Sequence, residues 1–255
     1  LVEVYNETDV ITSLASGASY SDTFPSVMLP LAGSYTMYAK SELVGDQNTS
    51  NDEISGSLSA ELPLCGTYAV GASQPLGFQN LTQAINKLNA LGVSCAVTYE
   101  LQSDYSSSGE TFPLTINPIT GISSVNTFTL KPGSGVNATI SGAASNNALI
   151  KILSNYVTID GSNSGSTTRN LSISNTSISS PSAILIGSSG TVPITNVIFK
   201  NCTVTNGINT SSAIVASDAT TLGNDGYFNN ILIQNNSIRK AYIGVYARAA
   251  ASAGN

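Results

Sequence analysis

Acidic side chains are the first candidates for chemistry in this sequence. The part of the chain after residue 62 contains six of them: Glu100, Asp104, Glu110, Asp160, Asp218 and Asp225. Two carboxyl groups about 5–10 Å apart can hydrolyse a glycosidic bond, one as the acid and the other as nucleophile or base. No two of these acids are adjacent, and a lyase would need an acid cluster beside a base such as Arg239, Lys240 or Arg248. We interpret the acids as structural, with Asp160 at a corner of the fold.

Histidine is absent from the sequence, and so is tryptophan. Without histidine the chain cannot build a Ser-His-Asp triad, a Cys-His nucleophile or a His-ligated zinc site. Only 9% of the residues are charged and the formal net charge is -6. This charge balance argues against binding to the phosphate backbone of a nucleic acid, because such binding needs clustered Lys and Arg. We therefore expect no nucleic-acid partner. No apolar run is long enough to cross a bilayer, so we also expect no insertion into a membrane.

One short acidic segment has the composition of a calcium site. Asp46, Asn48, Asn51 and Asp52 supply oxygen atoms at close spacing, and such hard ligands suit Ca2+. The segment lacks the glycine and the terminal glutamate of an EF-hand loop. A hairpin turn requires the same residue types for backbone reasons. The sequence therefore leaves two interpretations open, a calcium site and a plain polar turn, and predicts no other cofactor.

The cysteines, three in number, are too few for a disulfide-rich scaffold. Cys65 and Cys95 flank one compact unit and can form a disulfide with each other. Cys202 would then have no cysteine to pair with. An extracellular setting permits such a bridge, and we expect it to form. The alternative is three buried thiols, which behave as small hydrophobic side chains.

The elements that would position these residues change character near residue 62. In residues 1–62 polar and apolar residues alternate, most clearly between Glu53 and Leu62, as in a half-buried antiparallel strand. This length is small for a β-sandwich, whose usual size is about 100 residues. The chain also opens at Leu1 without a methionine. We therefore expect a piece of a longer polypeptide in which the front of this first domain is missing.

One helix is predicted between Asn80 and Leu91. Asn80 can cap the first turn, and Gln83 follows three places later, as in a capping box. Apolar residues recur at helical spacing: Leu81, Ala84, Ile85, Leu88 and Leu91. Gly92 stands where the end of a helix favours glycine. Such an amphipathic helix must lie on an apolar surface.

Beyond residue 110 the chain repeats short strands. One set has apolar residues two apart, followed by Asn or Gly, and its members begin at Tyr156, Asn170, Asn196 and Asn230. A second set contains Leu149–Ile152, Ile184–Gly187, Ile214–Ala216 and Ile243–Tyr246. Repeats of this length, with Gly, Asn and Ser between the strands, indicate a solenoid. Equivalent side chains can then stack coil on coil, which favours a parallel β-helix over a sandwich.

The predicted stacks are of two kinds. An aliphatic column, or parts of neighbouring columns, would contain Val157, Leu171, Val197 and Ile231. A corner ladder would contain Asn175, Asn201 and Asn235, because asparagine tolerates left-handed backbone geometry. Val157 and Leu171 are too close in sequence for a full turn. They are either successive strands of one coil or a coil with minimal corners.

A resemblance covers roughly residues 64–248. It rests on the segment that begins CGTYAVGASQPLGFQNLTQAINKLNALGVSC and on NYVTIDGSN and NVIFKNCTV further on. This region is similar to the right-handed parallel β-helix region of large type IX-secreted bacterial cell-surface proteins. The resemblance implies that the helix Asn80–Leu91 caps the N-terminal end of the coils, and that the protein is secreted to the cell surface. Residues 10–60, with GSYT and GDQNTSND, resemble the back half of CARDB-like or fibronectin-like sandwiches.

The expected fold is all-β. A partial Ig-like β-sandwich in residues 1–62 is followed by a right-handed parallel β-helix in residues 63–255, with a cap over 63–100 and coils over about 110–248. The expected function is a non-catalytic stalk or adhesin segment of a large secreted cell-surface protein. Its partners would be flanking domains of the same chain and glycans or other surface proteins. The rival function is a carbohydrate-active β-helix enzyme, a lyase or hydrolase, and a third possibility is self-assembly through exposed strand edges.

Overall fold

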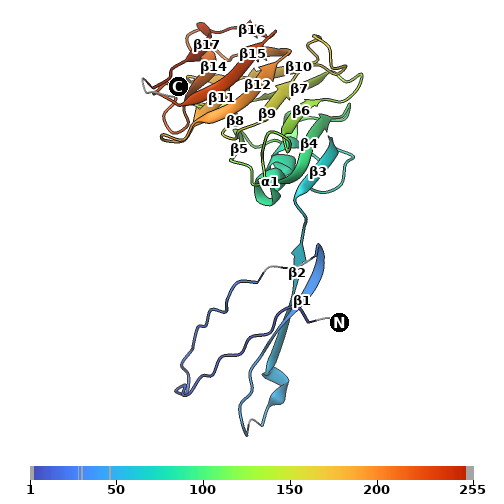
Figure 1. Cartoon of the computed structure of the whole chain (residues 1–255), viewed down its shortest axis with the longest axis vertical. Helices are drawn as coiled ribbons and strands as arrows, with labels where there is room; N and C mark the ends of the chain where they lie inside the picture. The colour runs from blue at the N-terminus through green and yellow to red at the C-terminus, as the bar shows by residue number, and fades with distance from the viewer. Residues whose placement is uncertain (1–2, 28, 30, 46, 251–255) are drawn as a thin grey trace. The chain divides into compact units, whose positions relative to one another are not determined.

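The computed structural model describes residues 3–27, 29, 31–45 and 47–250. The chain forms two compact units, Leu1–Leu62 and Pro63–Asn255, which Figure 1 colours from blue to cyan and from cyan to red.

The first unit contains one antiparallel strand pair, β1 (Gly33–Lys40) and β2 (Glu53–Ala60). A 3-10 turn, η1 (Thr49–Asn51), lies in the connection between them. One face of the pair carries apolar side chains, and Met37 and Ile54 on that face are 51% and 72% exposed. The described residues of this unit supply no second layer for that face, and the Ig-like sandwich stays a prediction.

Three parallel sheets make up the described part of the second unit. Sheet 1 contains β3 (Leu64–Val70), β4 (Val93–Leu101), β6 (Phe128–Pro132), β9 (Val157–Asp160), β12 (Ile194–Lys200) and β15 (Phe228–Gln234). Sheet 2 contains β5 (Leu114–Ile116), β8 (Ala148–Ile152), β11 (Ser182–Ser188), β14 (Ser212–Asp218) and β17 (Ile243–Ala247). Sheet 3 contains β7 (Ala138–Gly142), β10 (Leu171–Asn175), β13 (Cys202–Thr205) and β16 (Ser237–Arg239).

From coil 3 onward the chain visits the sheets in a fixed order, from sheet 1 through sheet 3 to sheet 2, and then starts the next coil. Before that, β3 is followed by the helix Leu81–Leu91, and β4 is followed by β5 without a strand in sheet 3. The strands β3, β4, β6, β9, β12 and β15 thus open coils 1 to 6 of the described chain. All strand pairs between coils are parallel, as the stacked, successively coloured ribbons of Figure 1 show. The predicted fold class, an all-β parallel β-helix, is confirmed.

The core is made of side chains stacked from coil to coil. In sheet 2, Ile184 lies between Ile150 and Ile214, and all three are fully buried. In sheet 1, Val197 lies beside Ile231. Each such fully buried side chain stabilises the fold by roughly 1.5–3 kcal/mol before entropy is subtracted.

The structure assigns the predicted aliphatic column to two sheets. Val157, at the start of β9, belongs to sheet 1, whereas Leu171 lies in sheet 3 between Ala138 and Cys202. Val157 and Leu171 are therefore successive strands of one coil, the first of the two readings that the sequence leaves open.

The helix α1 (Leu81–Leu91) covers the N-terminal end of the core. The side chain of Asn80 accepts the backbone N–H of Gln83, and Gly92 ends the helix with φ 66°. The inward residues of the helix are buried among the first coils: Leu81, Ala84, Ile85 and Leu88. The hydroxyl of the fully buried Tyr99 donates to the carbonyl of Ala84 at 2.8 Å, which joins the helix to β4.

Two polar side chains cover the first edges of sheets 2 and 3. Asn89 on α1 donates to the carbonyl of Thr115 at 2.9 Å and accepts the N–H of Asn117 at 3.0 Å, so it occupies the free edge of β5. Ser107, in the 3-10 turn η2 (Ser107–Gly109), does the same at β7, donating to the carbonyl of Thr139 at 3.0 Å. Free strand edges invite pairing with other chains, and these two edges are blocked.

Candidate functional site

Glu110, one of the six candidate acids, binds the start of α1. Its Oε1 accepts the N–H of Leu81 at 2.7 Å, and its Oε2 accepts the N–H of Thr82 at 2.6 Å. The hydroxyl of Tyr105 donates to Oε1 at 2.9 Å. A carboxylate at a helix N-terminus satisfies free amides and complements the helix dipole. Glu110 is therefore a second cap of the helix beside Asn80.

Three further acids hold loops. Asp104 accepts the backbone N–H of Ser73 at 2.8 Å and its hydroxyl at 2.5 Å, and these bonds hold the pKa of Asp104 below its usual value. Asp218 accepts the hydroxyl of Thr220, which with nearby backbone amides lowers the pKa of Asp218 as well. Asp225 forms an ion pair with Arg248.

The remaining two acids belong to a column of charges on the outer face of sheet 1. Glu100 pairs with Lys131 on the next strand at 2.9 Å. Asp160 on β9 pairs with Lys200 on the neighbouring strand β12 at 3.2 Å. Opposite charges on adjacent parallel strands stabilise the sheet modestly. Each carboxylate thus lies beside a lysine ammonium group, whose positive charge balances its negative charge.

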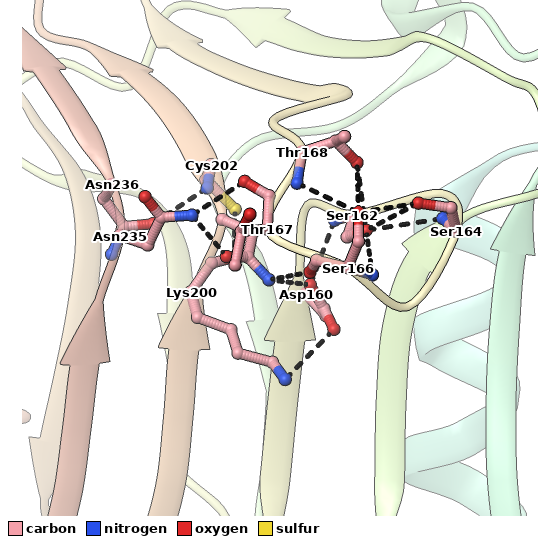
Figure 2. Close-up of polar contacts among 11 residues, drawn as sticks. Asp160, Ser162, Ser164, Ser166, Thr167, Thr168, Lys200, Cys202, Asn235 and Asn236 are labelled. Carbon is pink, nitrogen blue, oxygen red and sulfur yellow. Dashed lines mark hydrogen bonds and ion pairs between the residues drawn. The ribbon is translucent and has the colours of Figure 1, made fainter.

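Asp160 is also part of the corner between sheets 1 and 3 (Figure 2). Its Oδ1 accepts the side-chain amide of Asn201 at 2.7 Å and the backbone N–H of Ser162 at 3.0 Å. The amide of Asn235 donates to Oδ1 of Asn201 at 2.7 Å. Hydrogen bonds between stacked amides therefore connect this corner from coil 5 to coil 6.

The predicted ladder of three asparagines divides between two corners. Asn201 and Asn235 follow strands of sheet 1 and contact each other. Asn175 is the last residue of a sheet 3 strand, and its fully buried amide donates to the carbonyls of Ala144 and Ser182. The two positions look alike in sequence because an asparagine follows an apolar pair in both.

A polar loop, residues 161–170, wraps this corner from outside (Figure 2). Ser162 is 1% exposed, and its hydroxyl oxygen lies 3.0 Å from the hydroxyl oxygen of Thr168. Arg169 reaches two coils further and donates from Nε to the carbonyl of Asn235 at 2.8 Å. The amide of Asn235 in turn donates to the carbonyl of Thr167 at 2.8 Å. The loop thereby clasps coil 4 to coil 6.

The cysteines have separate environments. Cys65 on β3 and Cys95 on β4 form a disulfide with an S–S distance of 2.06 Å. Cys202 is free and fully buried in β13. Burial, with the charge of Asp160 as a smaller cause, raises the pKa of the Cys202 thiol far above its usual value. Because the thiolate is the reactive form, Cys202 is an inert core residue.

The candidate calcium segment forms the connection between β1 and β2. The side-chain oxygen of Asn48 accepts the hydroxyl of Ser50 at 2.6 Å, and the backbone of Asp52 accepts the N–H of Ser41 at 2.8 Å. Asn51 lies at the end of η1, and Asp46 lies outside the described residues. Over the residues that the structure does describe, no three His, Cys, Asp or Glu side chains gather where they could hold a metal ion.

A shallow groove on the outer face of sheet 1 was not predicted from the sequence. Its volume is about 210 Å³, and its lining residues are Thr127, Tyr156, Thr158, Asn196, Ile198, Asn230 and Leu232. The amide of Asn230 donates to Oδ1 of Asn196 at 2.6 Å. The signal in the sequence is the residue directly before each repeated apolar pair, which is Tyr156, Asn196 or Asn230. These residues are recognised as one column only when the strand pairing between the coils is known.

Comparisons with protein-family models, with curated proteins and with solved structures found no match to this chain. Within the described residues, no helix has the length and apolar character needed to cross a membrane.

Proposed function

We propose that the chain is a non-catalytic segment of a large secreted cell-surface protein, in which the solenoid is a rigid stalk or adhesin module. The observation that carries this proposal is that each of the six acidic side chains after residue 62 holds a structural partner: a helix end, a loop or a neighbouring base. Catalysis needs convergent groups around a reacting atom. These carboxylates instead accept hydrogen bonds from the backbone and from nearby side chains, or form ion pairs with neighbouring Lys and Arg side chains.

Mechanical rigidity is supported by contacts that skip a coil. Parallel strands bind each coil to the next, and Arg169 binds coil 4 directly to coil 6. In a solenoid, stability is a sum of each repeat and its interfaces with its neighbours. Contacts that span three coils make local opening of one coil more costly, which suits a stalk.

The location and partners belong to the same proposal. The Cys65–Cys95 disulfide suits an oxidising, extracellular compartment, to which type IX secretion would deliver the protein. The exposed apolar face of β1 and β2 supports a place for the first unit in an Ig-like, CARDB- or fibronectin-like sandwich. The partners are flanking domains of the same long chain and glycans or surface proteins, since solenoids bind ligands over extended faces.

Calcium at residues 46–52 is retained as part of this proposal. Asn48, Asn51 and Asp52 supply oxygen ligands in one connection. The test is thermal unfolding of the whole chain with added Ca2+ and with a chelator, and an unchanged melting temperature contradicts the site.

The main test is an assay for polysaccharide cleavage. The chain is incubated with plant and algal polysaccharides, and the products are followed as new reducing ends and as absorbance of unsaturated sugars. We expect neither signal. Product formation that disappears in Asp160→Asn or Asp218→Asn would contradict the non-catalytic proposal and favour the carbohydrate-active enzyme.

A further inference from the structure

We propose that the groove on sheet 1 binds a neutral carbohydrate chain, which lies across the strands and along the stack of coils. This inference rests on the proposed function, because it gives the adhesin module a ligand class and a place to bind it.

The groove runs between two columns of outward side chains. One column stands directly before the stacked core residues Phe128, Val157, Val197 and Ile231 and contains Thr127, Tyr156, Asn196 and Asn230. The other stands directly after that residue and contains Thr158, Ile198 and Leu232. The lining extends over coils 3 to 6, and successive strands are about 4.8 Å apart. The groove is therefore elongated in the direction in which a polymer would present repeated units.

The lining offers hydrogen bonds and apolar surface together. Among the described residues, the hydroxyls of Tyr156 and Thr158 and the Oδ1 atom of Asn230 have no hydrogen-bond partner. Ile198 and Leu232 supply the apolar floor, and Leu232 is 41% exposed. Sugars present hydroxyls at their edges and C–H groups on their faces, and ligand sites combine apolar walls with a few placed polar groups in this way.

The charges around the groove select an uncharged ligand. None of its lining residues carries a charge. The nearest column on the same face contains Asp160 and Lys200, which neutralise each other. The formal net charge of the chain is -6, which repels polyanions. Acidic polysaccharides are therefore the wrong class, and neutral glycans are the right one.

Tyr156 is the residue whose presence the fold itself does not explain. It has φ 54°, and Asn196 and Asn230 have φ 57° and 56° at the equivalent positions of the next coils, inside β12 and β15. Asparagine tolerates this left-handed conformation, whereas a bulky aromatic residue rarely adopts it. A ring held there against its backbone preference borders the groove, where it can stack on the face of a sugar.

The experiment is affinity electrophoresis of the whole chain in gels that contain one polysaccharide each. The neutral probes are hydroxyethyl cellulose, laminarin and galactomannan, and the acidic probes are alginate and polygalacturonate. Tyr156→Asn installs the residue that the next two coils have at the equivalent position, so it keeps the fold while removing the ring. Thr158→Val removes one hydroxyl and keeps a β-branched side chain. Tyr38→Asn, on the exposed strand β1, is the matched control.

We expect at least one neutral probe to retard the wild-type chain. Tyr156→Asn should bind that probe at least tenfold more weakly and melt at a higher temperature, Thr158→Val should lose less affinity, and Tyr38→Asn should bind as the wild type does. The inference is overturned when no neutral probe retards the chain, when an acidic probe is preferred, or when Tyr156→Asn binds normally. Cleavage of a probe is a separate result, which overturns the non-catalytic function.

Discussion

Asn235 donates its side-chain amide to Oδ1 of Asn201 across 2.7 Å, and both residues have left-handed backbones, with φ 51° and 59°. One residue type thus serves two purposes at this corner. The side-chain amides form hydrogen bonds between neighbouring coils. Because asparagine tolerates a positive φ, it can occupy the position where the chain turns from sheet 1 toward sheet 3. Asn201 is only 4% exposed, so its hydrogen bonds are made away from solvent.

Replacing Asn201 separates these two purposes. Asn201→Gly keeps the positive φ and removes the amide, and we expect the free energy of unfolding in urea to fall by about 2–3 kcal/mol, because buried partners lose their bonds. Asn201→Ala should cost about 1 kcal/mol more, since alanine is strained there. Asn230→Gly, at an exposed amide pair, is the control and should cost less than about 1 kcal/mol. Equal losses at residues 201 and 230 would contradict the buried ladder.

Removing the negative charge of Glu110 should destabilise the helix cap. Glu110→Gln exchanges one carboxylate oxygen for an N–H group that faces the backbone donor of Leu81 or Thr82. We expect the free energy of unfolding to fall by about 2–3 kcal/mol, measured by circular dichroism in urea. Glu100→Gln is the matched control, because its ion pair with Lys131 is partly exposed and should contribute less than about 1 kcal/mol. A smaller loss for Glu110→Gln than for Glu100→Gln would refute the capping role.

Loss of the disulfide should destabilise the second unit through the unfolded chain. Cys65 and Cys95 are 30 residues apart, and closing a loop of that size stabilises a fold by about 3–4 kcal/mol. We expect the double variant Cys65→Ser, Cys95→Ser to lose about that much in urea unfolding, and wild type under reductant to match it. No difference between oxidised and reduced wild type would show that the bridge does not form in solution.

Acid should weaken the loop that Asp218 holds. The hydroxyl of Thr220, followed by the backbone N–H of Thr221, lowers the pKa of Asp218 in the folded chain, whereas the unfolded value is about 3.9. The unfolded chain therefore binds more protons in this window, so the stabilisation is present above about pH 4 and is lost as the pH falls through the folded value. Melting temperatures between about pH 5 and 2 should decline less steeply in Asp218→Asn. Thr220→Val, which removes the largest cause, should flatten the same profile, and wild-type slopes in both variants would reject this account.

The fold was predictable from the sequence because its signals are local and repeated. Ile184 and Ile214 recur in equivalent apolar segments of the sequence, and the structure pairs these segments as neighbouring strands. Asn80 and Gly92 mark the ends of α1 as helix caps ordinarily do. The strands needed no knowledge of distant contacts.

The site residues were harder to place, because the corners depend on where loops are inserted. The loop 161–170 separates β9 from β10, whereas β12 is followed almost at once by β13. Consequently Asn175 and Asn201 follow similar apolar pairs and yet lie at different corners. The bonds between Glu110 and α1 join residues 28 and 29 positions apart, and nothing in the local sequence indicates them.

The side chains of Asn89 and Ser107 make the length of this module independent of its beginning. Both occupy the first edges of sheets 2 and 3, so these two edges are covered by residues that precede the later coils in the chain. Duplication of an internal coil in the gene, for example residues 194–227, would insert a layer whose corners match those on either side. Each copy would extend the reach of the protein by about 4.8 Å. Evolution can therefore adjust that reach in equal steps without redesigning the cap.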